Sequence, residues 1–158
     1  MISPVRLRTA LAAATVALVV AACGGHTTTK QDVIARGNAI CASAARDLLA
    51  TPPPAGGETS LPGLAAYLRA IMPILQREVS NLRALPRPTA DRALLAQYLS
   101  AVTQSGTTYR ALAAAAQRGD QEGVNQALAQ LQANPAPSLA ARYGLTQCAG
   151  ATGTTVPR

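Results

Sequence analysis

Residues 61–84 read LPGLAAYLRAIMPILQREVSNLRA and carry the clearest structural signal in the chain. Large apolar side chains recur at intervals of three or four residues, which places them along one face of an α-helix. Pro62 stands in the first turn, where its missing N–H costs nothing. Pro73 leaves the phase of the pattern unchanged, so we expect a kink there and not a break. The stretch predicts a helix from Leu61 to Ala84 whose apolar stripe is Leu64, Leu68, Ile71, Leu75, Val79 and Leu82.

A helix is also expected before this stretch, over residues 30–50, because apolar residues repeat there at helical spacing. Thr28 can cap it with Gln31 as its capping-box partner, and Cys41 falls at the edge of the apolar stripe. Residues 51–60 contain three consecutive prolines, which remove backbone donors and fix φ. This segment is therefore expected to be a loop.

Two further helices are expected after the quoted stretch, one over residues 90–118 and one after Asp120. Four helical segments without alternating β-branched runs predict an all-α fold, and more specifically a four-helix up-down-up-down bundle. The expected domain covers residues 30–148, followed by a flexible tail over residues 149–158. Thr89 is the expected cap of the third helix and Gly119 its terminator. Asp120 is the expected cap of the fourth helix, and Asn134–Pro137 should interrupt it. Gly144 is expected to end the helical part, with Leu145 as the apolar contact that follows a glycine stop.

The N-terminal residues 1–22 have the layout of a signal peptide. They begin with two arginines and no acid, and continue with the uncharged run 9–22, which is shorter than the ~20 residues of a membrane-spanning helix. Residues Val20-Ala21-Ala22-Cys23 resemble the bacterial lipobox. This resemblance implies cleavage between Ala22 and Cys23 and attachment of lipid to the Cys23 sulfur, although an ordinary signal peptide with a coincidental cysteine remains an alternative.

The predicted mature chain is thus a lipoprotein anchored to the extracytoplasmic face of the cell membrane through acyl chains on Cys23. Residues 23–29 lack apolar content apart from Cys23 and are expected to form a flexible tether. The single histidine of the chain, His26, lies in this tether without neighbouring ligands for a metal.

Once Cys23 is assigned to lipid, two cysteines remain, Cys41 and Cys148, which is an even number in an exported protein. A disulfide between them would close a loop of about 100 residues and could stabilise the fold by up to ~4.7 kcal/mol in the chain-entropy model. Two free redox-active thiols are the alternative, but there is no Cys-x-x-Cys spacing.

The residues that catalysis needs are scarce. The sequence has one histidine and seven acids, and it lacks a Gly-x-Ser-x-Gly, a Gly-x-Gly-x-x-Gly and a Glu-x-x-His motif. We therefore expect a protein that is not an enzyme and that uses no cofactor and no metal.

The net charge of +7 falls to +5 when the two arginines of residues 1–22 are removed. The remaining arginines are dispersed and are not interleaved with aromatic residues, so nucleic acid is not an expected partner. Arg83, Arg87 and Arg92 form the best candidate for a basic patch, which could meet an anionic membrane surface or an envelope polymer.

Four short motifs occur in this chain: Asn38–Cys41, residues 82–88, Arg118–Asp120 and Tyr143–Cys148. In this order, with a proline-rich loop and two cysteines, they resemble small actinobacterial lipoproteins of unassigned function. The resemblance implies a two-cysteine helical domain, a disulfide and a surface location, and no activity.

Two functions fit these observations. The first is a non-enzymatic interaction module of the cell envelope whose partner is an unknown protein or polymer. The second is a small-ligand or lipid-binding helical module, in which a kink at Pro73 and the small residues Gly106 and 113–116 open a cavity between helices.

Overall fold

The computed structural model of the protein describes residues 28–53 and 60–151, and all regular secondary structure in these two ranges is helical. The all-α prediction is therefore confirmed for this part of the chain. None of its helices combines the length and the apolar character that a membrane span requires. The six helices are α1 (Lys30–Leu49), α2 (Leu61–Arg83), α3 (Arg92–Arg118), α4 (Gln121–Gln132), α5 (Ala136–Tyr143) and α6 (Thr146–Ala151).

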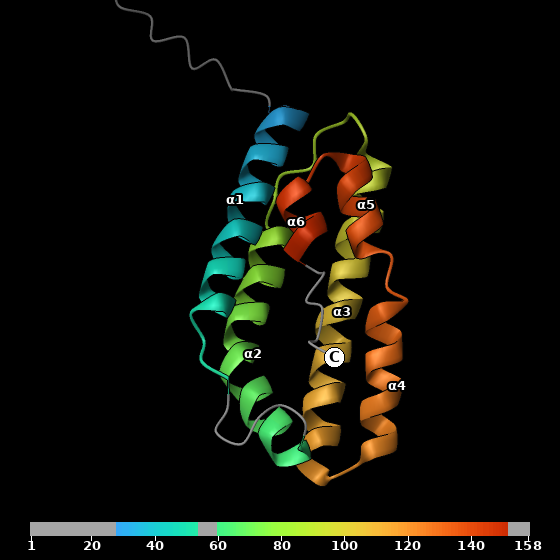
Figure 1. Ribbon diagram of the computed structural model, residues 1–158. Helices are drawn as coiled ribbons and strands as arrows, with labels where there is room; N and C mark the ends of the chain where they lie inside the picture. The colour runs from blue at the N-terminus through green and yellow to red at the C-terminus, as the bar shows by residue number, and fades with distance from the viewer. Residues whose placement is uncertain (1–27, 54–59, 152–158) are drawn as a thin grey trace, which may run out of the picture.

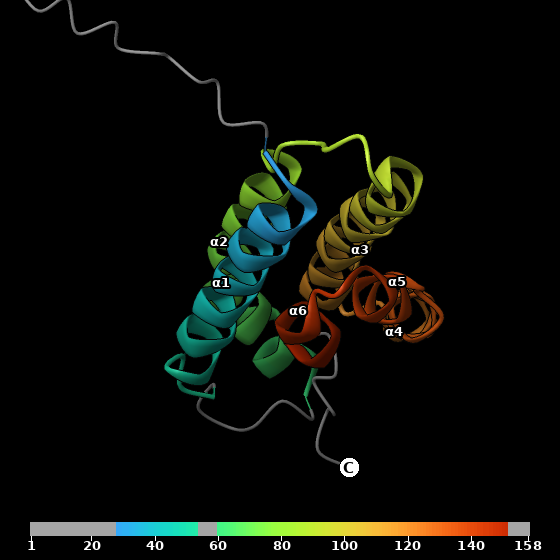
Figure 2. The same ribbon diagram turned by 90° about the horizontal axis from the view of Figure 1, so that it is seen from above.

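The helices pack as a bundle around two adjoining clusters of buried side chains (Figure 1). Helix α2 packs against α1 on one side and α3 on the other, and α3 also contacts α4 and α5. Viewed from above, α6 fills the space between α1 and α5 (Figure 2). The expected set of four helices is thus replaced by six in the described residues, since the fourth is divided and a short sixth helix follows.

The predicted signal peptide, residues 1–22, lies outside the described residues, as do Cys23 and His26. The first helix begins one residue later than its predicted cap. Thr29, not Thr28, is the N-cap of α1, and its hydroxyl accepts a hydrogen bond from the Asp32 N–H. The Asp32 carboxylate in turn accepts from the Thr29 N–H at 2.8 Å, so Asp32 and not Gln31 completes the capping box.

Helix α2 follows its prediction closely. Ser60 caps it by accepting from the Gly63 N–H, and Pro62 stands in the first turn. The helix continues through Pro73, which is exposed, and its axis changes direction along its length in Figure 1. It ends at Arg83 with Ala84 as its C-cap.

Helix α3 begins later than expected, because Thr89 is not its cap. The N-cap is Asp91, which has a left-handed backbone (φ 55°), a conformation that aspartate tolerates better than most residues. The other end matches the prediction: Gly119 stops α3 with φ 72°, and Asp120 caps α4 by accepting from the Gly123 N–H at 2.8 Å.

Asn134 divides the predicted fourth helix into α4 and α5. Its side-chain N–H donates to the Ala101 carbonyl of α3, and its side-chain oxygen accepts from the Ala136 N–H. These two hydrogen bonds fix the break against α3, where Pro135 and Pro137 also disfavour a continuous helix.

The helical part does not end at Gly144, as the sequence had suggested, but extends through α6 to Ala151. Gly144 does stop α5, with φ 104°, and the Leu145 N–H folds back onto the Ala140 carbonyl at 2.9 Å. Leu145 is completely buried. The turn sends the chain back into the bundle, where α6 carries Cys148 to α1.

Candidate functional site

The two cysteines of the bundle are joined in a disulfide. The Cys41 and Cys148 sulfurs are 2.02 Å apart, and neither residue is more than 2% exposed. Cys41 lies within the buried core and not at the edge of an apolar stripe. The pair is a structural link between α1 and α6, and the alternative of two free thiols is wrong.

Four acids of the described residues are held in structural interactions. Asp32 and Asp120 cap helices, while Asp47 pairs with Arg77 and Asp91 with Lys30. Within residues 28–53 and 60–151, no group of three potential metal ligands comes together.

One hollow on the bundle is a groove between α2 and α3 with a volume of about 620 Å³. Its floor is apolar and half-buried, and its rim is polar and exposed. This volume falls within the range of small-molecule sites, roughly 300–1,000 Å³. We call it the α2–α3 groove; it is lined by Met72, Leu75, Gln76, Val79, Ser80, Arg83, Arg87, Gly106 and Arg110.

The contact between Val79 and Gly106 sets the register of the groove. A Cβ on Gly106 would lie 3.4 Å from Val79 Cγ2, so these two residues face each other across the antiparallel helices. Arg83 lies one turn beyond Val79, and Arg110 one turn beyond Gly106 in the opposite direction. At a rise of 1.5 Å per residue, Arg83 and Arg110 are therefore about 12 Å apart along the groove. The groove thus has Arg83 and Arg87 at one end and Arg110, level with Leu75, at the other.

The predicted basic patch is only partly gathered in this groove. Arg83 and Arg87 line it, whereas Arg92 does not. Sequence reasoning missed Arg110, which lines the opposite wall and donates to the Thr107 hydroxyl. None of the three lining arginines forms an ion pair with another described residue. All three arginines are exposed and line the groove together with half-buried apolar residues, which suits an anionic partner that also has apolar surface.

The small residues predicted to open a cavity behave differently from one another. Gly106 lines the groove, but Ala113, Ala115 and Ala116 are buried in the core with Leu112. Close packing of these alanines fills the space that the sequence left open.

A second hollow, of about 270 Å³, lies between α1 and α2 and holds Glu78. Burial raises the pKa of this half-buried carboxyl to about 7. Burial also raises the pKa of the Tyr98 hydroxyl, and the charge of Glu78 raises it further. Asp47 and Arg77, which also line the hollow, are paired with each other. Glu78 is therefore a half-buried acid without an ion pair among the described residues, and its pKa lies near neutral pH.

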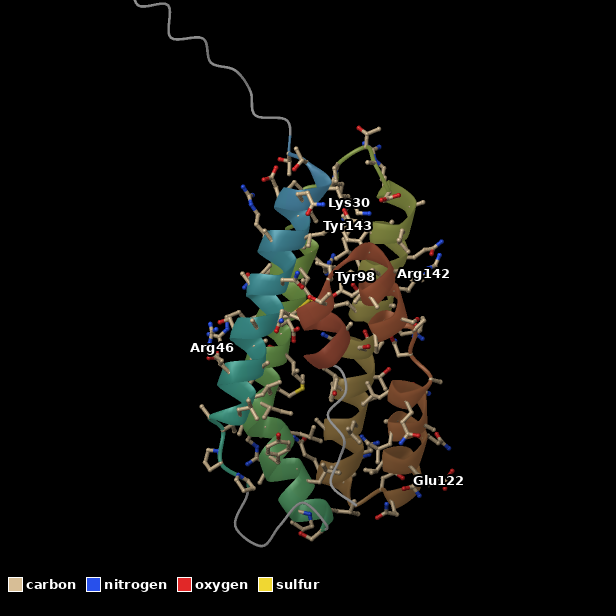
Figure 3. All side chains as sticks on the ribbon, turned by 45° about the horizontal axis from the view of Figure 1, so that its top comes forward. Lys30, Arg46, Tyr98, Glu122, Arg142 and Tyr143 are labelled. Atoms are coloured by element: carbon tan, nitrogen blue, oxygen red, sulfur yellow. A yellow bond between two sulfur atoms is a disulfide. The ribbon has the colours of Figure 1, made fainter. Side chains whose placement is uncertain are left out.

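Tyr143 lies at the end of the bundle where α1 begins (Figure 3). The Lys30 ammonium is 5.2 Å from the centre of its ring and also pairs with Asp91. Burial raises the pKa of the Tyr143 hydroxyl, while Lys30 lowers it and Asp91 raises it. The hydroxyl is buried and has no hydrogen-bond partner among the described residues.

Comparison of the chain with protein-family models, with curated proteins and with solved structures found no match.

Proposed function

We propose that this chain is a lipoprotein anchored to the extracytoplasmic face of the cell membrane, and that its helical domain is a non-enzymatic interaction module of the envelope. The lipobox-like residues Val20–Cys23 support the anchor. The buried disulfide supports export, because such bonds persist in oxidising compartments. The partner is an envelope protein or polymer that carries negative charge.

In this proposal the module is a four-helix bundle in an elaborated form. Helices α1, α2 and α3 are three helices of this bundle, and α4 and α5 together take the place of the fourth. The neighbour relations support this description, because α3 contacts both α4 and α5 while α6 joins α5 to α1. The short α6 then closes the bundle next to the disulfide.

The observation that carries the proposal is the α2–α3 groove. It combines three arginines that are unpaired within the described residues with a half-buried apolar floor. Aromatic residues and arginine are typical of binding hot spots, and a charged rim around apolar surface is typical of interfaces. The structural roles of Asp32, Asp91 and Asp120 support a binding function over a catalytic one.

Site-specific crosslinking in the native envelope tests the interaction. A photo-reactive amino acid replaces Gln76 or Ser80, which are exposed at the groove, or Gln126, which is exposed on α4 as a control. We expect a discrete adduct from the two groove positions and not from Gln126. Equal adducts at all three positions, or none at the groove, would contradict the proposal.

The anchor is tested separately. Cys23→Ser should prevent lipid attachment and leave the precursor uncleaved, and mass spectrometry of the wild-type N-terminus should find a diacylglyceryl group on Cys23. A wild-type chain that begins at another residue would contradict the lipoprotein assignment.

The volume of the groove and its apolar floor favour a second candidate, a small amphiphile bound between α2 and α3. Gly106→Leu places a side chain in the groove and should abolish such binding, whereas Gly106→Ala adds only a methyl group at ordinary contact distance from Val79. Native mass spectrometry of the purified chain measures bound ligand. Equal occupancy in both variants would count against this candidate.

A further inference from the structure

The start of α1 lies beside the turn that joins α2 to α3. Lys30, the first residue of α1, donates its ammonium to Asp91 at the end of this turn, and it also covers the Tyr143 ring. Figure 1 shows the beginning of α1 and the α2–α3 connection at the same end of the bundle. A chain that enters the domain at Lys30 therefore arrives next to this turn.

This end of the bundle is basic. Arg83 is the last residue of α2, Arg92 is the first of α3, and Arg87 lies between them. All three are exposed, and none is paired with a described residue. Two acids at this end, Asp32 and Asp91, are used by the Thr29 cap and by Lys30. We call Arg83, Arg87 and Arg92 the turn surface.

The opposite end of the bundle has a different charge balance. Arg118 pairs there with Asp120, and Glu122 in the first turn of α4 is exposed. Figure 3 shows Glu122 at the far end from Lys30. Of the described arginines without an ion pair to a described residue, Arg83, Arg87 and Arg92 are gathered at the α2–α3 connection beside the start of α1, whereas the others are dispersed over the helices.

The length of the connecting chain limits how far this end can be from an anchor. Seven peptide units separate Cys23 from Lys30. Fully extended they span at most about 25 Å. A lipid on Cys23 would therefore hold the turn surface within reach of the membrane, while the far end of the bundle would point away from it.

We propose that the turn surface docks on anionic phospholipid headgroups of the membrane that carries the anchor. This inference rests on the proposed lipid anchor and adds a second, electrostatic contact to it. Each basic residue near an anionic leaflet raises the docked population about five-fold. Together the three arginines change the ratio of docked to undocked protein on the order of 100-fold.

Docking also orients the α2–α3 groove. The basic end of the groove, at Arg83 and Arg87, belongs to the turn surface, and the groove runs along α2 and α3 away from it. With the turn surface on the membrane, the other end of the groove, with Met72, Leu75 and Arg110, is presented to partners above the headgroups.

The experiment reconstitutes the full chain in vesicles of phosphatidylcholine, with or without phosphatidylglycerol. A fluorescent amino acid replaces Thr89, which is exposed in the turn, or Gln117, which is exposed at the far end of α3. Quenching by lipids with nitroxide-labelled headgroups reports the distance from the membrane surface. The test variant replaces the three arginines of the turn surface by glutamine, and the matched control replaces three other exposed arginines, Arg46, Arg69 and Arg110.

We expect strong quenching at position 89 in anionic vesicles, weak quenching in phosphatidylcholine alone, and weak quenching at position 117 in both. The test variant should lose the quenching, and the control variant, with the same net charge, should keep it. Replacing Arg83, Arg87 and Arg92 by lysine should also keep it, since docking depends on charge. High salt should weaken it, because the screening length falls to about 3 Å at 1 M.

Three results would overturn the inference. These are equal quenching at position 89 in both kinds of vesicle, retention of quenching in the glutamine variant, and equal losses in the test and control variants. Flotation of the vesicles separates this failure from failure of the anchor. A chain that floats with vesicles but shows no quenching contradicts docking alone, whereas a chain that does not float contradicts both the anchor and docking.

Discussion

Replacing Cys41 and Cys148 together by alanine removes the covalent link between α1 and α6. The two residues are separated by 107 positions, and a loop of this size is worth up to about 4.7 kcal/mol in the chain-entropy model. The native state loses packing as well, since both sulfurs are buried. We therefore expect the free energy of unfolding to fall by about 3–5 kcal/mol, and the melting temperature by about 10 °C or more.

The loss should begin locally. Helix α6 has six residues and is held to the bundle mainly through Leu145, the disulfide and the hydrogen bond from the Gln147 N–H to Asn38. A helix this short is not stable by itself. Without the bridge, amide exchange should increase first in α6 and in the facing part of α1, and remain slow in α3.

Urea denaturation of the full chain in mild detergent, followed by circular dichroism, measures the change. Reduction of the wild-type disulfide should destabilise the protein by a comparable amount, and the same reductant should leave the double alanine variant unchanged. A difference of less than about 1 kcal/mol between oxidised and reduced wild type would refute the reasoning. Two free thiols in the non-reduced protein, detected by mass spectrometry, would refute the bridge itself.

Four further substitutions test individual packing and charge effects. Tyr143→Phe removes a buried hydroxyl that has no hydrogen-bond partner among the described residues, so it should raise the free energy of unfolding by about 1 kcal/mol or more. A lower free energy of unfolding in urea denaturation would show that the hydroxyl makes a stabilising hydrogen bond. Glu78 has a pKa of about 7 in the fold against 4.5 for an unperturbed glutamate, so the free energy of unfolding should fall by at most about 3 kcal/mol as pH rises from 4.5 to 7. Glu78→Gln should remove this fall, and identical pH profiles for the two proteins would contradict the assignment. Gly37→Val should destabilise the protein by about 1–3 kcal/mol, because a Cβ there overlaps the buried Leu145 side chain. Gly106→Ala should stabilise it by about 0.5–1 kcal/mol, because alanine favours a helix and its methyl group fits beside Val79. Thermal unfolding in which both changes have the same sign would argue against this difference between the two glycines.

Helix positions were largely predictable because their signals are local. Pro62 at the start of α2, Gly119 at the end of α3 and the Asp120 cap act through backbone groups a few residues away. The cap of α1 was placed wrongly because Thr28 and Thr29 have the same chemistry. What distinguishes them is the reciprocal hydrogen bond from Thr29 to Asp32, which depends on where the first turn actually begins.

The groove could not be derived from the sequence because it depends on the register between two helices. Arg83 and Arg87 are near each other in the chain, so their proximity was predictable. Arg110 joins them only because Val79 faces Gly106 across the α2–α3 contact. The pattern of apolar residues shows which face of each helix is buried, but not how far one helix slides along the other.

Gly37 shows the same limit in the core. The sequence places it on the apolar stripe of α1, where it could be any small residue. Its role comes from Leu145, more than a hundred positions later, whose side chain occupies the space of a Cβ. The need for glycine there follows from where the Leu145 side chain packs, and the local glycine-stop signal at Gly144 does not reveal that position.

The disulfide finally determines how the domain carries mechanical load. The bridge turns the chain from Cys41 to Cys148 into a closed ring, and both walls of the α2–α3 groove belong to this ring. A pull between the start of α1 and a partner in the groove divides at Cys41 into two arms. One arm runs forward through the rest of α1 into α2, and the other crosses the sulfurs and runs back through α6, α5 and α4 into α3. A force that pulls α2 or α3 away from the start of α1 therefore puts tension on both covalent paths of the ring, and each path bears only part of the force.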